Sequence, residues 1–265
     1  MFLDREFFWV HLGLAGTGIM IMMLCAAEVG VRFGRRGRKT SDDPTRSQYT
    51  AIEGAALAVV GLLLAFTFSM SASRFENRKQ IVVNEANALG TAWLRAQLLP
   101  ESEGQEVRSL LRSYVDAWLE LHEGGPDVTR HAAASKELDR LQDQLWSRAS
   151  AAARRDPNSV TLSLLLQSLN EVFDRQSELM AAVANRVPGV VLLLLTVTAA
   201  VSLGMVGYCS GLAGRRNFVA TFTLGLLIAG TILVILDFDR PRRGLIQLSP
   251  RSMIVLRESM DRPAP

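Results

Sequence analysis

The stretch GAALAVVGLLLAFTFSMSA, residues 54–72, decides the fold, because about 20 successive apolar residues are what a helix needs to cross a lipid bilayer. In lipid, every backbone N–H and C=O must be bonded within the segment, so such a run predicts an α-helix. Similar runs lie at Phe7–Val31, Val187–Gly207 and Phe218–Leu236. We therefore predict four transmembrane helices, arranged as two pairs that a long intervening segment separates.

Charge is kept apart from these apolar runs. Hydrophobic residues make up 49% of the chain, although 21% of it is charged. Residues 74–186 carry fourteen basic and sixteen acidic side chains, so this segment is close to neutral. No basic face is interleaved with stacking aromatics, which argues against a nucleic-acid partner. Both cysteines, Cys25 and Cys209, lie in apolar runs, so no disulfide framework is expected.

The segment between the two pairs has the pattern of a soluble helical domain. Apolar residues recur at spacings of three and four, the mark of one buried helix face. Breaks are expected at Pro100, at 124–126 and at 156–157, where proline and glycine cluster. The last helix of the domain is expected to continue into the third membrane helix, with only a bend at Pro188. The side chains expected to point inward include Val107, Leu111, Tyr114, Trp118, Leu138, Leu141, Leu145, Trp146, Leu165 and Leu169.

These patterns together predict an all-α, polytopic membrane protein in which an antiparallel helical bundle joins two pairs of transmembrane helices. Residues 1–73 hold the first pair with its basic loop, 74–186 the extramembrane domain, 187–239 the second pair and 240–265 a basic tail.

The positive-inside rule gives an orientation, because basic loops stay in the cytoplasm. The first apolar run is preceded by Arg5 alone and followed by five basic residues within 32–39; Arg215 and Arg216 in the second short loop agree. Arginines and a lysine also flank the opposite ends of the membrane runs. From the first helix we expect a protein of the cytoplasmic membrane whose helical domain lies outside the cytoplasm.

No constellation of residues indicates an enzyme. The histidines His11, His122 and His131 are scattered, and the sequence has no glycine-rich phosphate loop, nucleophile elbow or metal-ligand spacing. We therefore expect no catalytic residues, no cofactor and no metal site. The partner that the sequence predicts is the lipid bilayer.

The second apolar run holds a candidate gate. Leu62, Phe66 and Met70 are four residues apart and so share one helix face, where they form either a dewetting constriction or ordinary packing. Glu53 is expected to open this helix, where a carboxylate suits the positive end of the helix dipole. The small residues Gly54, Ala58 and Gly61 are expected to face other helices.

Two further polar patches are candidate sites or interfaces. Glu85, Asn87 and Thr91 interrupt an apolar helix, and they form a seam between subunits, the lining of a vestibule or hydrogen bonds inside the bundle. Asp237 and Asp239 end the last membrane run, where the helix dipole disfavours a carboxylate. Cationic partners are therefore expected, in a structural salt bridge or at an ion site, and the candidates are Arg240, Arg242 and Arg243.

Several short elements along the chain occur together in one known family. They are Glu53-Gly54-Ala55, Phe66-Thr67-Phe68-Ser69, Arg74-Phe75, Glu85-Ala86-Asn87, Gly90-Thr91-Ala92, Arg95, Leu98-Leu99-Pro100 and Asp237-Phe238-Asp239-Arg240-Pro241-Arg242-Arg243-Gly244. With these elements the chain resembles the bestrophin-like family of bacterial and plant membrane proteins, a domain of unknown function.

The resemblance implies kinship with bestrophins, which are oligomeric anion channels of four-helix membrane units with an attached helical domain. It also implies a cytoplasmic helical domain, opposite to the orientation expected from the first helix. The acidic cluster with which bestrophins bind calcium has no counterpart here, so calcium gating is not implied.

Two functions follow as hypotheses. The first is a homo-oligomeric ion channel, an anion channel on the resemblance, whose pore is lined by the second helix of each subunit. The second is a membrane-anchored sensor or scaffold whose helical domain binds a partner.

Overall fold

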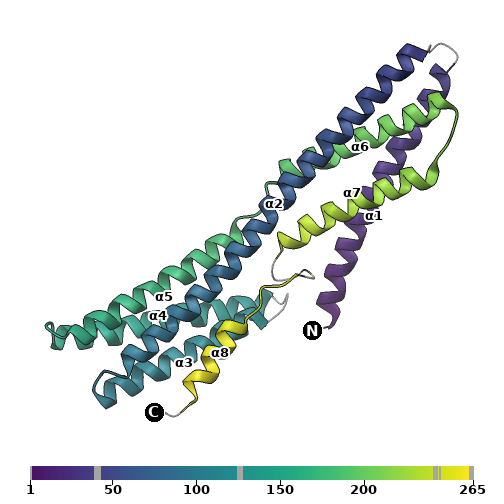
Figure 1. The fold of residues 1–265 in the computed structure, drawn as a ribbon. Coiled ribbons are helices and arrows are strands. Elements are labelled where there is room, and N and C mark those ends of the chain that lie inside the picture. The colour runs from purple at the N-terminus through teal and green to yellow at the C-terminus, as the bar shows by residue number, and fades with distance from the viewer. Residues whose placement is uncertain (1, 39–42, 124–127, 241–243, 245, 263–265) are drawn as a thin grey trace. The chain divides into compact units, whose positions relative to one another are not determined.

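The computed structural model describes residues 2–38, 43–123, 128–240, 244 and 246–262, with the side chains of 2–12, 123 and 128 left aside. Within these ranges every regular element is an α-helix (Figure 1). The helices are α1 (Phe2–Gly37), α2 (Asp43–Ala96), α3 (Glu101–Glu123), α4 (Val128–Arg155), α5 (Val160–Ala184), α6 (Gly189–Ala213), α7 (Phe218–Phe238) and α8 (Arg251–Met260).

The chain forms two compact units. The membrane unit consists of residues 6–73 and 186–240, and the bundle unit of residues 1–5, 74–185 and 241–265. Among the described residues, four stretches of helix are long and apolar enough to cross a membrane, and they contain Gly13–Gly37 of α1 and the whole of α2, α6 and α7. The protein is thus an all-α, polytopic membrane protein, as the sequence predicts.

Apolar side chains fill the interior of the membrane unit. Met23 of α1, Val60 of α2, Leu203 of α6 and Ile232 of α7 are each at most 1% exposed and belong to one cluster. The outer faces of the same helices carry large aliphatic residues that stay exposed, such as Leu227 of α7. This distribution suits helices whose surroundings are lipid, since the outside is then as apolar as the core.

Glycines bring the backbones of α1 and α6 into direct contact. A Cβ added at Gly30 or Gly34 of α1 would overlap a backbone carbonyl oxygen of α6, and one added at Gly207 or Gly211 of α6 would overlap a carbonyl oxygen of α1. The glycines are four residues apart on each helix, the spacing at which small residues allow close approach in membranes. This pair of glycine rows was not singled out in the sequence.

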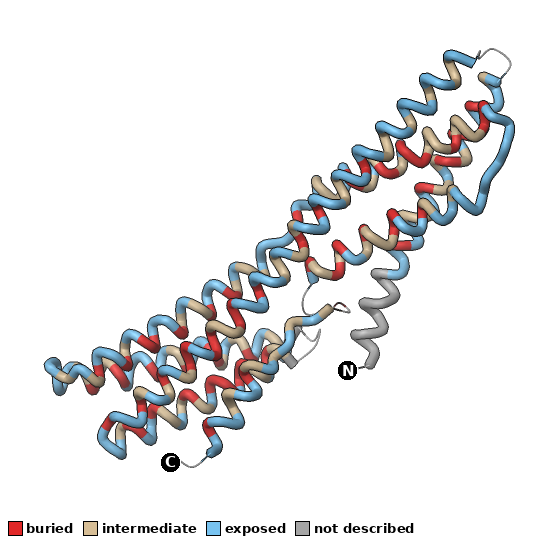
Figure 2. Tube along the Cα trace, in the orientation of Figure 1, coloured by how far each residue is buried: buried red, intermediate tan, exposed pale blue. Residues whose placement is uncertain are grey.

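The core of the bundle unit follows the predicted stripes. Leu111, Trp118, Leu138, Leu165 and Leu169 are all at most 1% exposed, and Figure 2 shows buried positions recurring along the helices of this unit. The prediction for Trp146 was wrong, because its side chain is 41% exposed. Leu145 already occupies the inward position, and the next residue in a helix points about 100° away.

The boundaries of the bundle helices agree with the signals at Pro100 and at 156–157, with one difference, while the break expected at 124–126 lies outside the described residues. Ser159 caps α5, its hydroxyl accepting a hydrogen bond from the backbone N–H of Leu162. The expectation that α5 continues into the third membrane helix was wrong, because residues 185–188 interrupt the helix. Pro188 has no N–H to donate, and the N–H of Val187 donates to the carboxylate of Asp239 and not to a helical carbonyl.

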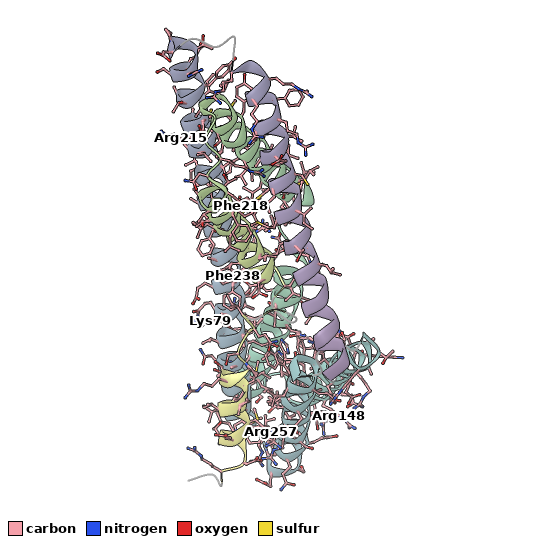
Figure 3. The ribbon with its side chains drawn as sticks, turned by 90° about the vertical axis from the view of Figure 1, so that its right-hand side faces the viewer. Lys79, Arg148, Arg215, Phe218, Phe238 and Arg257 are labelled. Atoms are coloured by element: carbon pink, nitrogen blue, oxygen red, sulfur yellow. The ribbon has the colours of Figure 1, made fainter. Side chains whose placement is uncertain are left out.

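Helix α8 lies in the segment where the sequence indicates only a basic tail. It packs against α3, and Met253 and Met260 are buried in the core of the bundle unit. Arg257, labelled in Figure 3, pairs with Asp116 of α3 at 2.5 Å. The α8 stretch is too short and too polar to give a clear apolar period, which explains why it was not predicted.

We predict that Gly207→Ala destabilises the membrane unit, because the added methyl group would collide with the backbone of α1. Overpacking of this kind typically costs about 1–3 kcal/mol. The midpoint of thermal unfolding of the detergent-solubilised protein measures the effect.

Gly230→Ala is the matched control, since a Cβ at Gly230 of α7 meets nothing within 4 Å. Equal melting temperatures for the two variants would contradict the proposed role of the glycine rows.

Candidate functional site

In the membrane unit, α2 has one buried and one uncovered face. Val60, Thr67 and Ser71 are buried, whereas Leu62 is 57% exposed and Phe66 is 66% exposed. Met70, one turn after Phe66, is partly exposed. Residues four apart share a helix face, so the three candidate gate residues lie on the face of α2 that the rest of the membrane unit leaves open.

The small residues of the same face border open space within the part of the chain that the structure describes. A Cβ added at Gly54 or Gly61 would meet nothing within 4 Å, and Ala58 is exposed. The expectation that these residues face other helices is therefore not met inside a single subunit. We call the row Gly54, Ala58, Gly61, Leu62, Phe66, Ser69, Met70 and Ser73 the open face of α2.

The expected place of Glu53 at the start of the second helix was wrong. Helix α2 begins at Asp43, so Glu53 lies almost three turns inside it and gains nothing from the positive end of the helix dipole. Its partly buried side chain lies beside the thiol of Cys209 on α6. The first turn holds Pro44, which is well tolerated there because that N–H has no helical partner.

Glu85 is placed inside the bundle unit. Its side chain is fully buried, and its Oε2 accepts a hydrogen bond of 3.0 Å from the indole N–H of Trp118 on α3. The hydroxyl of the neighbouring Tyr114 accepts a hydrogen bond from the amide of Gln142 on α4. Of the three alternatives for Glu85, hydrogen bonding within the bundle is the one that this geometry supports.

Burial raises the pKa of Glu85 from its ordinary 4.5 to about 8. Glu85 lies beyond the apolar stretch that ends at Ala72, and burial in the bundle core removes water from its carboxyl group. Hydrogen bonds from Trp118 and Tyr114 favour the charged form but do not offset the loss of water. The carboxyl group is therefore mainly protonated at neutral pH.

Asn87 and Thr91 point away from this core. Both are exposed, and the Thr91 hydroxyl donates to the backbone carbonyl of Asn87 at 3.0 Å. Leu94 is 63% exposed on the same side of α2, and Leu98, in the turn that follows this helix, is 68% exposed. Asn87 and Thr91 thus remain candidates for a subunit interface or for the lining of a vestibule, the other two alternatives given for this patch.

The acidic end of α7 is buried. Asp237 is 3% and Asp239 8% exposed, and Asp239 accepts the N–H of Val187 at 2.9 Å, just before α6 begins. A carboxylate suits that position, because it faces the positive end of the α6 dipole. Arg240 is exposed, while Arg242 and Arg243 lie outside the described residues, so pairing of Asp237 with these arginines stays a prediction.

Arg78 has a structural role that the sequence reasoning missed. It is 1% exposed and donates to the carbonyls of Ala182 and Asn185, each at 2.9 Å, at the end of α5. A cation there satisfies carbonyls that have no helical partner and suits the negative end of the dipole. The sequence signal for its burial is spacing: Arg78 lies four residues before Val82 and seven before Glu85, so the three share one face of α2.

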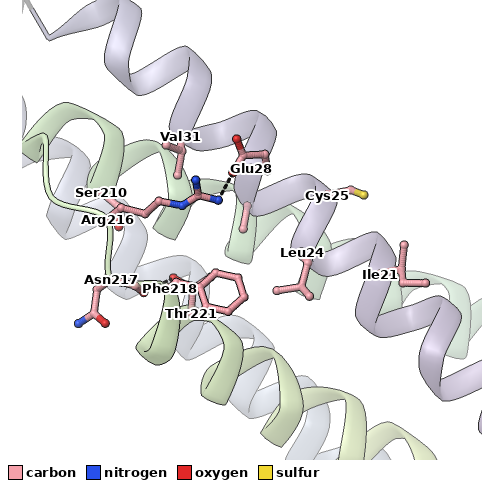
Figure 4. A pocket seen from close by; sticks show the side chains of 11 residues that line it. Ile21, Leu24, Cys25, Glu28, Val31, Ser210, Arg216, Asn217, Phe218 and Thr221 are labelled. Atoms are coloured by element: carbon pink, nitrogen blue, oxygen red, sulfur yellow. Dashed lines mark hydrogen bonds and ion pairs between the residues drawn. The ribbon is translucent and has the colours of Figure 1, made fainter.

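Glu28 of α1 lies at the edge of a pocket of about 390 Å³ between α1 and the start of α7 (Figure 4). It pairs with Arg32 of its own helix at 3.3 Å and with Arg216 of the loop before α7. Leu24 and Phe218 contribute to the apolar wall. Among the described residues, no group of three or more His, Cys, Asp or Glu side chains is placed to hold a metal ion.

Comparison with known proteins identifies the family to which the chain belongs. The sequence profile of the Bestrophin-like domain matches residues 19–253, nearly the whole chain. The chain belongs to the bestrophin-like family. No curated protein matches it.

Solved structures share the fold of this bestrophin-like protein at low sequence identity. A bacterial bestrophin homologue from Klebsiella pneumoniae, solved by Zn-SAD phasing, is 15% identical with a TM-score of 0.63, over 93% of this chain and 96% of that one. A mutant of the same homologue is 14% identical with a TM-score of 0.64, over 92% of this chain and 97% of that one. A structure described as a membrane protein is 12% identical with a TM-score of 0.65, over the same shares of the two chains.

The candidate residues of the bestrophin-like chain do not converge on one catalytic centre. Leu62 and Phe66 lie on the open face of α2, Glu85 lies in the bundle core, and Asp239 lies at the end of α7.

We predict that Glu85→Gln stabilises the protein at alkaline pH. Because the folded state holds a proton on Glu85 that the unfolded state releases above about pH 4.5, stability falls as pH rises from there through about 8. The glutamine keeps an acceptor for Trp118 but cannot ionise. We expect a gain on the order of 4 kcal/mol at pH 8.5 and little change at pH 5, measured by thermal unfolding across pH.

Glu106→Gln, which removes an exposed carboxylate of α3, should leave the pH dependence as it is in the wild type. Persistence of the wild-type slope in Glu85→Gln would show that Glu85 is not the group responsible.

Proposed function

We propose that this bestrophin-like protein is a homo-oligomeric anion channel of the cytoplasmic membrane, with the open face of α2 lining the conduction path. The observation that carries the proposal is the position of Phe66. This large aromatic residue stands 66% exposed, in a row with the exposed Leu62, on a membrane helix whose other face is packed.

A path through a single subunit is disfavoured by the packing of the membrane unit. Its interior is closed by apolar side chains such as Met23, Leu203 and Ile232. An ion would lose its hydration there without gaining a polar partner, at a cost of several kcal/mol. The path that the packing favours lies between subunits.

The composition of the open face supports a symmetric contact or pore. Gly54, Ala58 and Gly61 allow copies of α2 to approach closely. A ring of Leu62 and Phe66 side chains from several subunits would then form an apolar constriction that conducts only when it is wetted. By contrast, α7 exposes long aliphatic residues such as Leu227, as expected for contact with lipid.

The preference for anions rests on the polar groups of the open face and not on its charge. Residues 54–73 contain neither an acidic nor a basic side chain, so this stretch supplies no ring of carboxylates, as many cation channels use, and no ring of arginines or lysines. The exposed hydroxyls of Ser69 and Ser73 can donate hydrogen bonds to a partly dehydrated anion. Kinship with bestrophins, which are anion channels, points the same way.

We predict that Phe66→Ala raises the conductance of the reconstituted protein at least about twofold, because a ring of methyl groups leaves a wider constriction that wets more easily. Planar-bilayer recording in chloride, with gluconate as the impermeant anion, measures the change. Light scattering of the same sample gives the mass of the assembly.

Leu227→Ala, which truncates a residue of similar exposure on α7, is the matched control and should conduct like the wild type. A monodisperse monomer in several mild detergents and in nanodiscs would contradict both the channel and the assembly. A stable oligomer that never conducts would favour the membrane-anchored scaffold, with the bundle unit as its binding part.

We also propose, from the basic cluster after the first membrane run, that the α6–α7 loop lies in the cytoplasm and the bundle unit outside it. In a chain with Cys25 and Cys209 replaced by serine, cysteine at Arg154 should react with an impermeant thiol reagent in intact cells. Cysteine at Arg215 should react only after lysis. The reverse pattern would give the cytoplasmic domain that kinship with bestrophins implies.

A further inference from the structure

The bundle unit holds a polar pocket of about 300 Å³ that belongs to none of the sites described above. Its walls come from the end of α2 and the start of α3, which follow each other in the sequence, and from the end of α8, which is distant from both. The lining residues are Trp93, Gln97, Gln105, Arg108, Ser109, Arg112, Met260 and Arg262.

The pocket is positively charged. It has three arginines and no carboxylate in its lining. Arg108 is paired with Glu101 at 3.2 Å and Arg112 with Asp261 at 2.9 Å, both with acids outside the lining. The exposed Arg262 is in none of the ion pairs found between described residues, so its full charge is available to a ligand.

Arg112 is held in place and is still partly exposed. Its guanidinium lies 5.6 Å from the centre of the Trp93 ring, which fixes the plane of the fork, and it also donates to the carbonyl of Met260. Its side chain is 39% exposed, so part of the guanidinium is accessible to a ligand.

We propose that this pocket binds a phosphate monoester, either a soluble one or the exposed phosphate of a lipid headgroup. A phosphate monoester offers three acceptor oxygens and close to two negative charges, and the arginine fork matches its geometry. The Ser109 hydroxyl and the amides of Gln97 and Gln105 supply further donors. Because Met260 and Arg262 form one wall, the bound phosphate ties the end of α8 to α3.

Calorimetric titration of the full-length protein in detergent, in chloride-free buffer, tests the proposal. The probes are glycerol 3-phosphate, inorganic phosphate and short-chain phosphatidic acid. We expect saturable binding, and a melting temperature about 3 °C higher at ten times the Kd. Arg262→Gln should weaken binding at least about tenfold, whereas Arg251→Gln, an exposed arginine of α8 outside the pocket, should change it less than about twofold.

The three probes separate the two sources of the phosphate. Binding of glycerol 3-phosphate at least as tight as that of phosphatidic acid indicates a soluble ligand. Binding of phosphatidic acid alone, or at least about tenfold tighter binding of it, indicates a lipid headgroup. Gln105→Glu, which places a carboxylate in the pocket, should abolish binding while leaving the melting temperature without ligand unchanged. No saturable binding of any probe to the wild type, or equal binding by the wild type, Arg262→Gln and Gln105→Glu, would overturn the proposal.

Discussion

Backbone contact between α1 and α6 is the constraint on which the membrane unit depends. In lipid the hydrophobic effect does not hold helices together, so association relies on close packing. The glycine rows at Gly30 and Gly34 and at Gly207 and Gly211 provide it, because any side chain there would overlap the facing backbone. With α1 and α6 held in this way, one face of α2 packs inside the unit and the other is left open.

The open face gives the channel proposal its physical content. A helix face that exposes only long aliphatic side chains is suited to contact with lipid and to nothing else. The open face of α2 instead combines small residues, hydroxyl groups and one large aromatic side chain, Phe66. Such a face suits contact with copies of itself or with water.

Buried charged side chains bind backbone groups in both units, near the residues where the chain passes from one unit to the other. In the bundle unit, Arg78 satisfies the last carbonyls of α5. In the membrane unit, Asp239 binds the N–H of Val187 just before α6. Each interaction stabilises a helix end of the matching polarity, so the break at residues 185–188 is a built feature and not a fraying end.

The fold is retained where the sequence is not. The bacterial bestrophin homologue from Klebsiella pneumoniae is 15% identical to this chain, with a TM-score of 0.63 over almost the whole length of both. Apolar runs and helix-breaking residues need only chemical type and spacing, so they survive changes of individual residues. The same tolerance explains why the architecture was readable from one sequence, whereas the function was not.

The sequence by itself determined the features that depend on local pattern. The four apolar runs predicted the membrane helices, and the stripe through Leu111 and Trp118 predicted the buried face of α3, since both follow from hydrophobicity and helical period. Only the tertiary structure decided which polar groups are inside. Glu85 and Asn87 lie two residues apart in one polar patch, yet one is buried against Trp118 and the other is exposed. Whether Glu53 opens a helix, whether Gly54 or Gly207 meets another backbone and whether α8 docks on α3 were decided in the same way. The reason is that these outcomes depend on which neighbour, distant in sequence, occupies the facing position, and a local pattern carries no information about that neighbour.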